Sequence, residues 1–172
     1  MGGGRLTIAN MLTLLRLAAV PLIVYLFSIE EVDPRWIALV FVLTGITDVL
    51  DGRLARSRNE VTRFGTLVDP LADKLMVLAT VFSLVARGSL PRWVAFLLAA
   101  KELALIVGAG FFLVSRSKVT PASNAGKLAT VLLYVGITGT IIGVSGMLYV
   151  VILGVGVSIL AGLGYLLQAL GK

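Results

Sequence analysis

Four aspartates, paired as Asp48 with Asp51 and Asp69 with Asp73, stand close together in a chain that has only nine acidic residues. Spacings of three and four residues place both members of a pair on one face of a helix. Carboxylates crowded among apolar residues repel one another and lose hydration, so protons or cations must offset their charge. Hard divalent cations such as Mg²⁺ take oxygen ligands, and two such ions can share a few carboxylates. The pattern therefore predicts a metal site built from two helix ends.

The composition indicates a single membrane domain covering residues 1–172. The chain is 58% hydrophobic and has a mean hydropathy of +1.02, well above a soluble domain. It contains no cysteine and no histidine, which excludes disulfides, thiolate zinc sites and histidine-based acid–base catalysis. A general base must then be a carboxylate, a lysine or a tyrosine. The net charge of +6 comes from cations that interrupt apolar runs, so we expect anionic lipids or phosphorylated substrates as partners and no nucleic acid.

Six apolar runs predict the helices that position the aspartates. We expect an all-α, polytopic membrane protein, a six-transmembrane-helix bundle with a short interfacial segment near Arg5 to Met11 before the first span. The expected spans cover about residues 12–28, 36–55, 65–86, 93–114, 128–144 and 147–170. The first aspartate pair then falls in the last turns of the second span, and the second pair in the first turns of the third.

The distribution of cations predicts the orientation. Among the cations in loops and at span ends, nine lie on the side of the aspartates and three on the other side. By the positive-inside rule, both termini and the metal site face the cytoplasm, in a cytoplasmic membrane of the bacterial type. The nine are Arg5, Arg53, Arg56, Arg58, Arg63, Arg116, Lys118, Lys127 and Lys172, and the three are Arg35, Arg87 and Arg92.

The spacing around the aspartates also resembles a known signature. Asp48-x-x-Asp51-Gly52-x-x-Ala55-Arg56, then eight residues, then Gly65-x-x-x-Asp69-x-x-x-Asp73, is similar to the signature of the CDP-alcohol phosphotransferase family, and every position is filled. Polar helix ends that merely reach water are the alternative, but they would favour mixed charges over four acids. The resemblance implies transfer of a phosphatidyl group from CDP-diacylglycerol to an alcohol, with release of CMP. It also implies a homodimer.

The resemblance gives the matching residues their roles. Asp73 would take the proton of the acceptor hydroxyl, and the four aspartates would hold Mg²⁺ or Mn²⁺, as two ions. The Asn-x-x-Thr-x-x-Arg pattern at residues 10–16 is similar to the first helix of two branches of the family, although Arg16 could instead extend outward to the membrane surface. The donor-binding positions so implied are Asp48, Gly52, Ala55, Arg56, Gly65, Asn10, Thr13 and Arg16.

Cations near the predicted metal site are candidates for binding an acceptor that carries a phosphate. Ordinary positive-inside bias explains the loop cations equally well, and Lys101 with Glu102 could be a structural ion pair in the fourth span. Synthases that use glycerol 3-phosphate usually have Arg-Glu at positions 101 and 102, and a further arginine where this chain has Ala109. The candidates are Arg63, Lys101, Arg116, Lys118 and Lys127.

The resemblance implies glycerol 3-phosphate as the acceptor, which gives phosphatidylglycerophosphate. The runs Asp69 to Lys74 and Gly126-Lys127-x-x-Thr130 resemble that branch of the family, and the first run also resembles its cardiolipin synthases. Cardiolipin synthesis from phosphatidylglycerol, or transfer to another alcohol such as inositol phosphate, is the alternative. A proton-coupled transporter is a different class, but the aspartate pairs are not repeated along the chain. In the last two spans, Gly139-x-x-x-Gly143 and Gly154, Ser158 and Gly162 predict close helix contacts.

Overall fold

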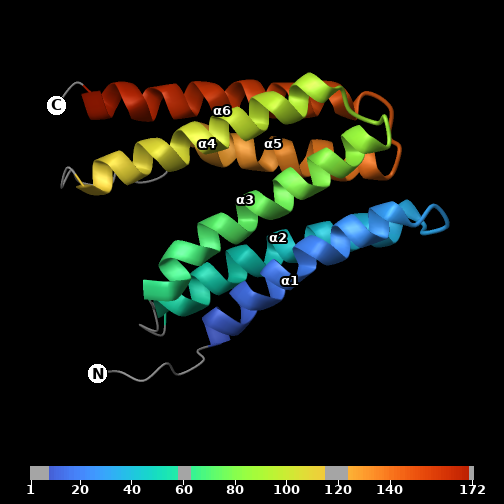
Figure 1. The fold of residues 1–172 in the computed structure, drawn as a ribbon, viewed down its shortest axis with the longest axis horizontal. Coiled ribbons are helices and arrows are strands. Elements are labelled where there is room, and N and C mark those ends of the chain that lie inside the picture. Colours follow the sequence, from blue (N-terminus) through green and yellow to red (C-terminus); the bar gives the residue numbers. More distant parts are fainter. Residues whose placement is uncertain (1–7, 58–62, 115–123, 171–172) are drawn as a thin grey trace. The chain divides into compact units, whose positions relative to one another are not determined.

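The computed structural model is entirely helical in the parts of the chain that it describes (Figure 1). It describes the backbone of residues 8–57, 63–114 and 124–170, and the side chains of residues 11, 13–47, 68, 71–104 and 124–164. Each expected span corresponds to one helix, with ends that differ by a few residues. The segment 8–11, expected to lie along the membrane surface, forms the first turn of α1. The helices are α1 (Ile8–Ser28), α2 (Pro34–Ser57), α3 (Arg63–Ala86), α4 (Arg92–Val114), α5 (Asn124–Ile141) and α6 (Met147–Leu170).

Local sequence explains where two of these helices begin and end. Pro34 is the first residue of α2, where a missing N–H costs no hydrogen bond, and Asp33 Oδ1 accepts a 2.8 Å bond from the Arg35 N–H. After α5, Gly143 has a φ of 77°, a left-handed conformation that favours glycine. Its N–H donates to the carbonyl oxygen of Thr140 at 3.2 Å. Gly143 therefore lies in the turn that ends α5. The Gly139-x-x-x-Gly143 spacing predicted that it would take part in a helix contact, and this prediction is wrong for Gly143.

The chain divides into two compact units, residues 1–84 and 85–172. In the first unit, α1 packs against α2, and Ile23, Phe41 and Met76 are fully buried in the core. In the second unit, α5 and α4 both pack against α6, with Ile137 and Val151 in the core. Thus α6 is the shared packing partner that organises the second unit.

Glycines allow α5 and α6 to approach closely. A Cβ atom on Gly136 would lie 2.8 Å from the backbone nitrogen of Val151, and one on Gly154 would lie 3.0 Å from the backbone nitrogen of Leu133. Larger residues at these positions would push the helices apart. The close contact expected from the small-residue pattern is therefore found within one protomer.

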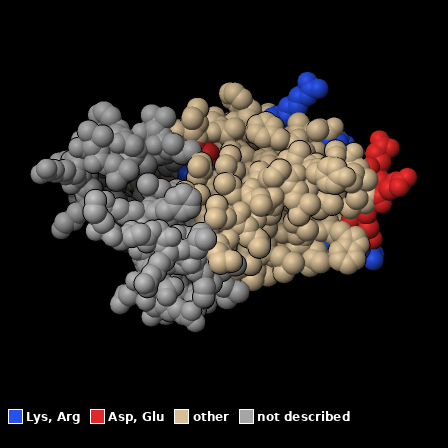
Figure 2. Space-filling view, turned by 60° about the horizontal axis from the view of Figure 1, so that its bottom comes forward, with Lys and Arg blue, Asp and Glu red and all other residues tan. Residues whose placement is uncertain are grey.

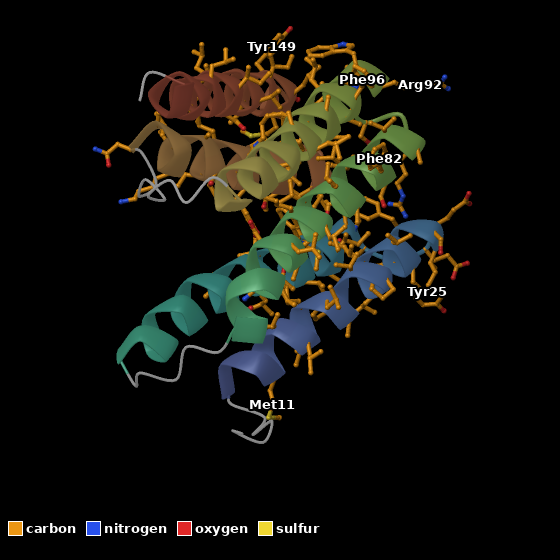
Figure 3. The ribbon with its side chains drawn as sticks, turned by 60° about the vertical axis from the view of Figure 1, so that its left-hand side comes forward. Met11, Tyr25, Phe82, Arg92, Phe96 and Tyr149 are labelled. Atoms are coloured by element: carbon orange, nitrogen blue, oxygen red, sulfur yellow. The ribbon has the colours of Figure 1, made fainter. Side chains whose placement is uncertain are left out.

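The outer surface of the helices is apolar. Large apolar side chains are exposed on all six helices, and Figure 3 shows Met11 and Tyr25 projecting from α1, Phe96 from α4 and Tyr149 from α6. Tyr149 is 75% exposed and Phe96 is 71% exposed. In Figure 2 most of the described surface in view is uncharged, and most of its acidic and basic side chains gather near one margin. Such extensive apolar exposure fits a lipid environment.

One helix in the described part of the chain is long and apolar enough to cross a membrane. It is the 18-residue stretch Met147–Gly164 of α6, with a mean hydropathy of 2.3. Thr13–Ser28 and Pro34–Thr47 are shorter apolar stretches. The helices therefore match the six expected in number and place, while a clear span is found for α6.

Candidate active site

Two polar residues of α1, Thr13 and Arg16, are buried in the interior of the first unit. Thr13 and Arg16 are each 1% exposed, and they share a face of α1 with the buried residues Ala19, Ile23 and Phe27. The alternative that Arg16 extends to the membrane surface is therefore wrong. A buried guanidinium requires polar or charged partners, because burial without them is costly. Arg16 does interact with other groups of the protein.

The buried face of α2 leads to the first aspartate pair. Ile37, Phe41 and Thr44 are 0%, 0% and 6% exposed and follow one another at helical spacing. Position 48 comes four residues after Thr44, and position 51 comes seven after it, so the backbone register places both on this same face. The hydroxyl of Thr44 donates to the carbonyl oxygen of Phe41 at 2.7 Å, so it needs no other partner.

Positions 69 and 73, which carry the second pair, fall in register with the buried residues of α3. Ala72, Met76 and Thr80 are each 0% exposed. Position 69 is seven residues before Met76, and Asp73 is seven before Thr80, so both share this face. The Asp73 side chain is half-buried and interacts with other groups of the protein. A carboxylate at the border of a buried face can be reached by a substrate.

The aspartate positions of the two helices lie at similar distances from the helix ends. Position 51 is six residues before the end of α2 at Ser57, and position 69 is six after the start of α3 at Arg63. Position 48 is nine residues before that end, and Asp73 is ten after that start. At a rise of about 1.5 Å per residue, positions 51 and 69 form one layer about 9 Å from these helix ends, and positions 48 and 73 form a second layer about 14 to 15 Å from them.

The polar part of α1 reaches the same layers. The start of α1, the end of α2 and the start of α3 lie at one end of the first unit (Figure 1). Arg16 is twelve residues before the end of α1 at Ser28, and position 48 is fourteen after the start of α2 at Pro34. Because only a short turn separates these two helices, Arg16 and position 48 differ in height by about 3 Å. Three helices thus bring polar positions to one end of one unit.

The structure describes only part of the site predicted from the sequence. Asp48, Asp51, Asp69, Gly52, Ala55, Arg56, Arg63, Gly65 and Asn10 lie in helices, but their side chains are outside the described set, and Arg116 and Lys118 are outside the described residues altogether. Among the side chains that are described, no three acidic residues come together as metal ligands. The four-aspartate metal site and its ion content therefore stay predictions.

The ammonium group of Lys101 interacts with Glu102 and with Ser158. Its Nζ forms an ion pair with Glu102 and donates a 2.7 Å hydrogen bond to the Oγ of Ser158 on α6. The side chains of Lys101 and Glu102 are 15% and 12% exposed. Sequence reasoning considered the ion pair but missed Ser158, which it took only as a small residue. By contrast, Lys127 is exposed near the start of α5, where a soluble anion can reach it.

Comparison with known proteins gives the family. The family model for CDP-alcohol phosphatidyltransferase matches residues 6–161, which is most of the chain and covers both units. The chain belongs to this family. The family is membrane-associated and generally depends on a divalent metal ion. The family and the class of enzyme predicted from the sequence are thus confirmed, and the transporter hypothesis finds no support.

The individual relatives are named for two different activities. A protein of Mycobacterium tuberculosis named probable phosphatidylglycerophosphate synthase is 36% identical over 95% of this chain and 81% of its own length. A CDP-diacylglycerol–glycerol-3-phosphate 3-phosphatidyltransferase of Rickettsia typhi is 37% identical over 84% of this chain and 83% of its own length. A CMP-forming cardiolipin synthase of Streptomyces coelicolor is 42% identical over 61% of this chain, and this match covers 51% of that protein.

Proposed function

We propose that this protein transfers the phosphatidyl group of CDP-diacylglycerol to glycerol 3-phosphate, forming phosphatidylglycerophosphate and releasing CMP. The observation that carries the proposal is the convergence of polar positions from α1, α2 and α3 at one end of a unit whose sequence carries the family signature. Two relatives that match this chain over more than 80% of both lengths are named for this reaction.

The chemistry follows from the residues of the two layers. The acceptor hydroxyl oxygen attacks the phosphorus that carries diacylglycerol, and the bond from that phosphorus to the oxygen of CMP breaks. Asp73 accepts the hydroxyl proton, as the family signature implies, and a carboxylate base is one of those that a chain without histidine permits. Its position at the border of the buried face of α3 supports this role, because the base must touch both the site and the incoming acceptor.

The donor set fits a pair of hard cations. The sequence places four aspartates on α2 and α3, and carboxylate oxygen is the ligand that Mg²⁺ and Mn²⁺ prefer. Asp48, Asp51 and Asp69 would hold the ions, with Asp73 sharing one. Bound there, the ions would neutralise the pyrophosphate and polarise the phosphorus under attack.

Arg16 and Thr13 extend the donor site onto α1. A buried guanidinium near the height of position 48 can form charge-assisted hydrogen bonds with a phosphate. The small residues Gly52, Ala55 and Gly65 allow a nucleotide close to the backbone, and Arg56 can reach its phosphates. Asn10, one turn before Thr13, belongs to the same face of α1.

We propose that the acceptor binds on the cytoplasmic side. Arg63, Arg116, Lys118 and Lys127 provide the positive charge that a phosphomonoester requires. Cardiolipin synthesis from phosphatidylglycerol is the second candidate. It is favoured by the Streptomyces relative, by Ala109 in place of an arginine, and by the neutralisation of Lys101 by Glu102.

A membrane setting completes the proposal. Five of the six helices have 21 or more residues and α5 has 18, enough to cross or nearly cross a hydrocarbon core of about 30 Å. We infer six spans in the cytoplasmic membrane, with both termini and the active site facing the cytoplasm, and a homodimer as in the family. The exposed Trp36 and Trp93, each next to a turn opposite the aspartates in the span order, fit an aromatic belt.

The deciding experiment is CMP release by the purified protein with CDP-diacylglycerol and Mg²⁺, with acceptors added one at a time. Release that requires glycerol 3-phosphate, and that EDTA abolishes and Mg²⁺ restores, would support the leading proposal. Release only with phosphatidylglycerol would assign a cardiolipin synthase instead. Release with neither would overturn both and direct the search to inositol phosphate and other alcohols.

A further inference from the structure

The tripeptide Pro-Arg-Trp occurs twice in the chain, at residues 34–36 where α2 begins and at residues 91–93 where α4 begins. The two copies share one pattern of burial. The arginine and the tryptophan are exposed, while the two residues that follow the tryptophan are buried. Trp36 is 63% exposed and Trp93 is 47% exposed. Each of the two units therefore presents one exposed arginine–tryptophan pair.

The charges around the two copies are opposite in sign. Three acidic residues precede the first copy and give its turn a net negative charge. They are Glu30, Glu31 and Asp33. The turn before the second copy contains no acidic residue and one further arginine, Arg87, so its net charge is positive. An anion is therefore repelled at the first copy and attracted at the second.

Within the second unit, the sequence provides only one acidic residue with which Arg92 could pair. This residue is Glu102, and its carboxylate is largely buried in an ion pair with the Nζ of Lys101. Arg92 is exposed, and Figure 3 shows it extending away from the start of α4. Arg87 is exposed as well, but it interacts with other groups of the protein. Arg92 is thus the better placed of the two to bind an external anion.

Exposed aromatic side chains lie at the same end of the second unit as Arg92. α4 and α6 both begin at this end (Figure 1). The hydrogen bond from Lys101 to Ser158 agrees with this, because it joins positions nine and eleven residues after the two helix starts. Trp93 and Tyr149 are in the first turns of these helices, and Tyr149 is 75% exposed. Tryptophan and tyrosine at span ends typically lie at the level of the lipid headgroups.

Positive-inside bias does not account for Arg87 and Arg92. In the proposed orientation they lie on the outer side of the membrane, where the rule predicts few cations. Anionic lipids attract cations that lie close to the membrane surface, and a guanidinium can donate two parallel hydrogen bonds to a phosphate. The exposed aromatic rings beside Arg92 place it at a bilayer surface, which favours a lipid phosphate over a soluble one.

We propose that Arg87, Arg92 and Trp93 bind the headgroup of an anionic phospholipid in the outer leaflet, and that the matching pair Arg35 and Trp36 does not. Arg92 donates to the lipid phosphate, Arg87 adds positive charge, and Trp93 packs against the lipid below the headgroup. The inference rests on the membrane setting of the proposed function and not on the reaction.

This surface is separate from the exposed cation of α5. α5 runs back along α6 after a short turn, so Lys127 near its start lies at the other end of the second unit (Figure 1). Removing the charge of Arg92 should therefore change the lipid preference of the protein and leave the acceptor KM unchanged.

The test uses the two tryptophans as reporters, because the chain contains no others. The variant Trp36→Phe retains only Trp93, and Trp93→Phe retains only Trp36. Each full-length variant is reconstituted into phosphatidylcholine vesicles that contain a fixed fraction of phosphatidylglycerol with brominated acyl chains, which quench the fluorescence of an adjacent tryptophan. The same fraction of brominated phosphatidylcholine gives the reference. CDP-diacylglycerol is left out, so no transfer takes place.

We expect brominated phosphatidylglycerol to quench Trp93 more than brominated phosphatidylcholine does, and to show no such excess at Trp36. With Trp93 as the reporter, Arg92→Gln should lower the relative affinity for phosphatidylglycerol about fivefold, and Arg87→Gln should lower it less. Arg35→Gln is the matched control and should leave the preference at Trp93 unchanged. Because these arginines are exposed, the thermal unfolding midpoints should stay the same.

Equal quenching of Trp93 by the two lipids would overturn the proposal. An equal preference at Trp36 would overturn it too, because the effect would then be a general property of the membrane surface. Inorganic phosphate added to the vesicles should leave the quenching unchanged. If it abolished the preference at Trp93, the surface would bind a soluble phosphate and not a lipid headgroup. The measurement needs no turnover, so an absence of CMP release would refute the proposed function without affecting this result.

Discussion

Gly136 of α5 lies directly against the backbone of Val151 on α6, so closely that a Cβ atom at position 136 would come 2.8 Å from the nitrogen of Val151. Real Cβ atoms essentially never approach a neighbour this closely. The obstacle is backbone, which cannot move aside as a flexible side chain can. The separation of α5 and α6 is therefore one that glycine permits and alanine does not.

Gly136→Ala should lower the stability of the protein. Forcing a methyl group into a packed contact typically costs about 1–3 kcal/mol. Gly156→Ala on α6 is the matched control, because a Cβ there would have nothing within 4 Å. At that open site the gain in helix propensity, about 1 kcal/mol, should leave stability unchanged or raised. Thermal unfolding in detergent measures the stability of both variants. Equal unfolding midpoints for Gly136→Ala and Gly156→Ala would contradict the close contact at Gly136.

Arg16→Met should impair donor binding far more than a surface substitution does. Charge-assisted hydrogen bonds contribute about 1.5–3 kcal/mol, so the KM for CDP-diacylglycerol should rise at least about tenfold. Arg16→Lys should raise the KM for CDP-diacylglycerol less than Arg16→Met does, because lysine keeps the charge but loses the planar donor geometry. Arg35→Met, at the exposed start of α2, is the control and should leave this KM unchanged. An unaltered donor KM in Arg16→Met would remove Arg16 from the donor site.

Asp73→Asn should abolish turnover while nucleotide binding survives. An amide cannot accept the proton of the acceptor hydroxyl, so kcat should fall by about 10²–10⁴-fold. Because the other three aspartates remain, CDP should still raise the thermal unfolding midpoint in the presence of Mg²⁺. Asp33→Asn, which keeps the capping oxygen at the start of α2, is the control. Turnover close to that of the unaltered protein would exclude Asp73 as the base.

Much of the fold was predictable because the information is local. Runs of apolar residues separated by short polar turns give helices whether or not their partners are known, and Pro34 and Gly88 mark turns by their own backbone preferences. The shared helix face of each aspartate pair follows from spacings of three and four without tertiary information, while the metal site itself stays a prediction.

The burial of Arg16 and the partner of Lys101 required the tertiary structure. An arginine in the first turns of an apolar helix can face inward or reach the surface, and the packing of α1 against α2 decides between them. Lys101 and Ser158 are 57 residues apart, and no local pattern links a lysine to one particular serine on a later helix. Long-range contacts of this kind are the part of the site that sequence spacing cannot supply.

Lys127→Ala should weaken acceptor binding without affecting the donor. Lys127 is exposed and lies three residues after the start of α5, where the helix N-terminus also favours an anion. Losing one charge-assisted contact should raise the acceptor KM by about tenfold and leave the KM for CDP-diacylglycerol unchanged. Arg92→Ala, an exposed cation at the start of α4 (Figure 3), is the control and should change neither. If the effect of Lys127→Ala fell on CDP-diacylglycerol alone, Lys127 would belong to the donor site, and the acceptor phosphate would have to rely on Arg63, Arg116 and Lys118.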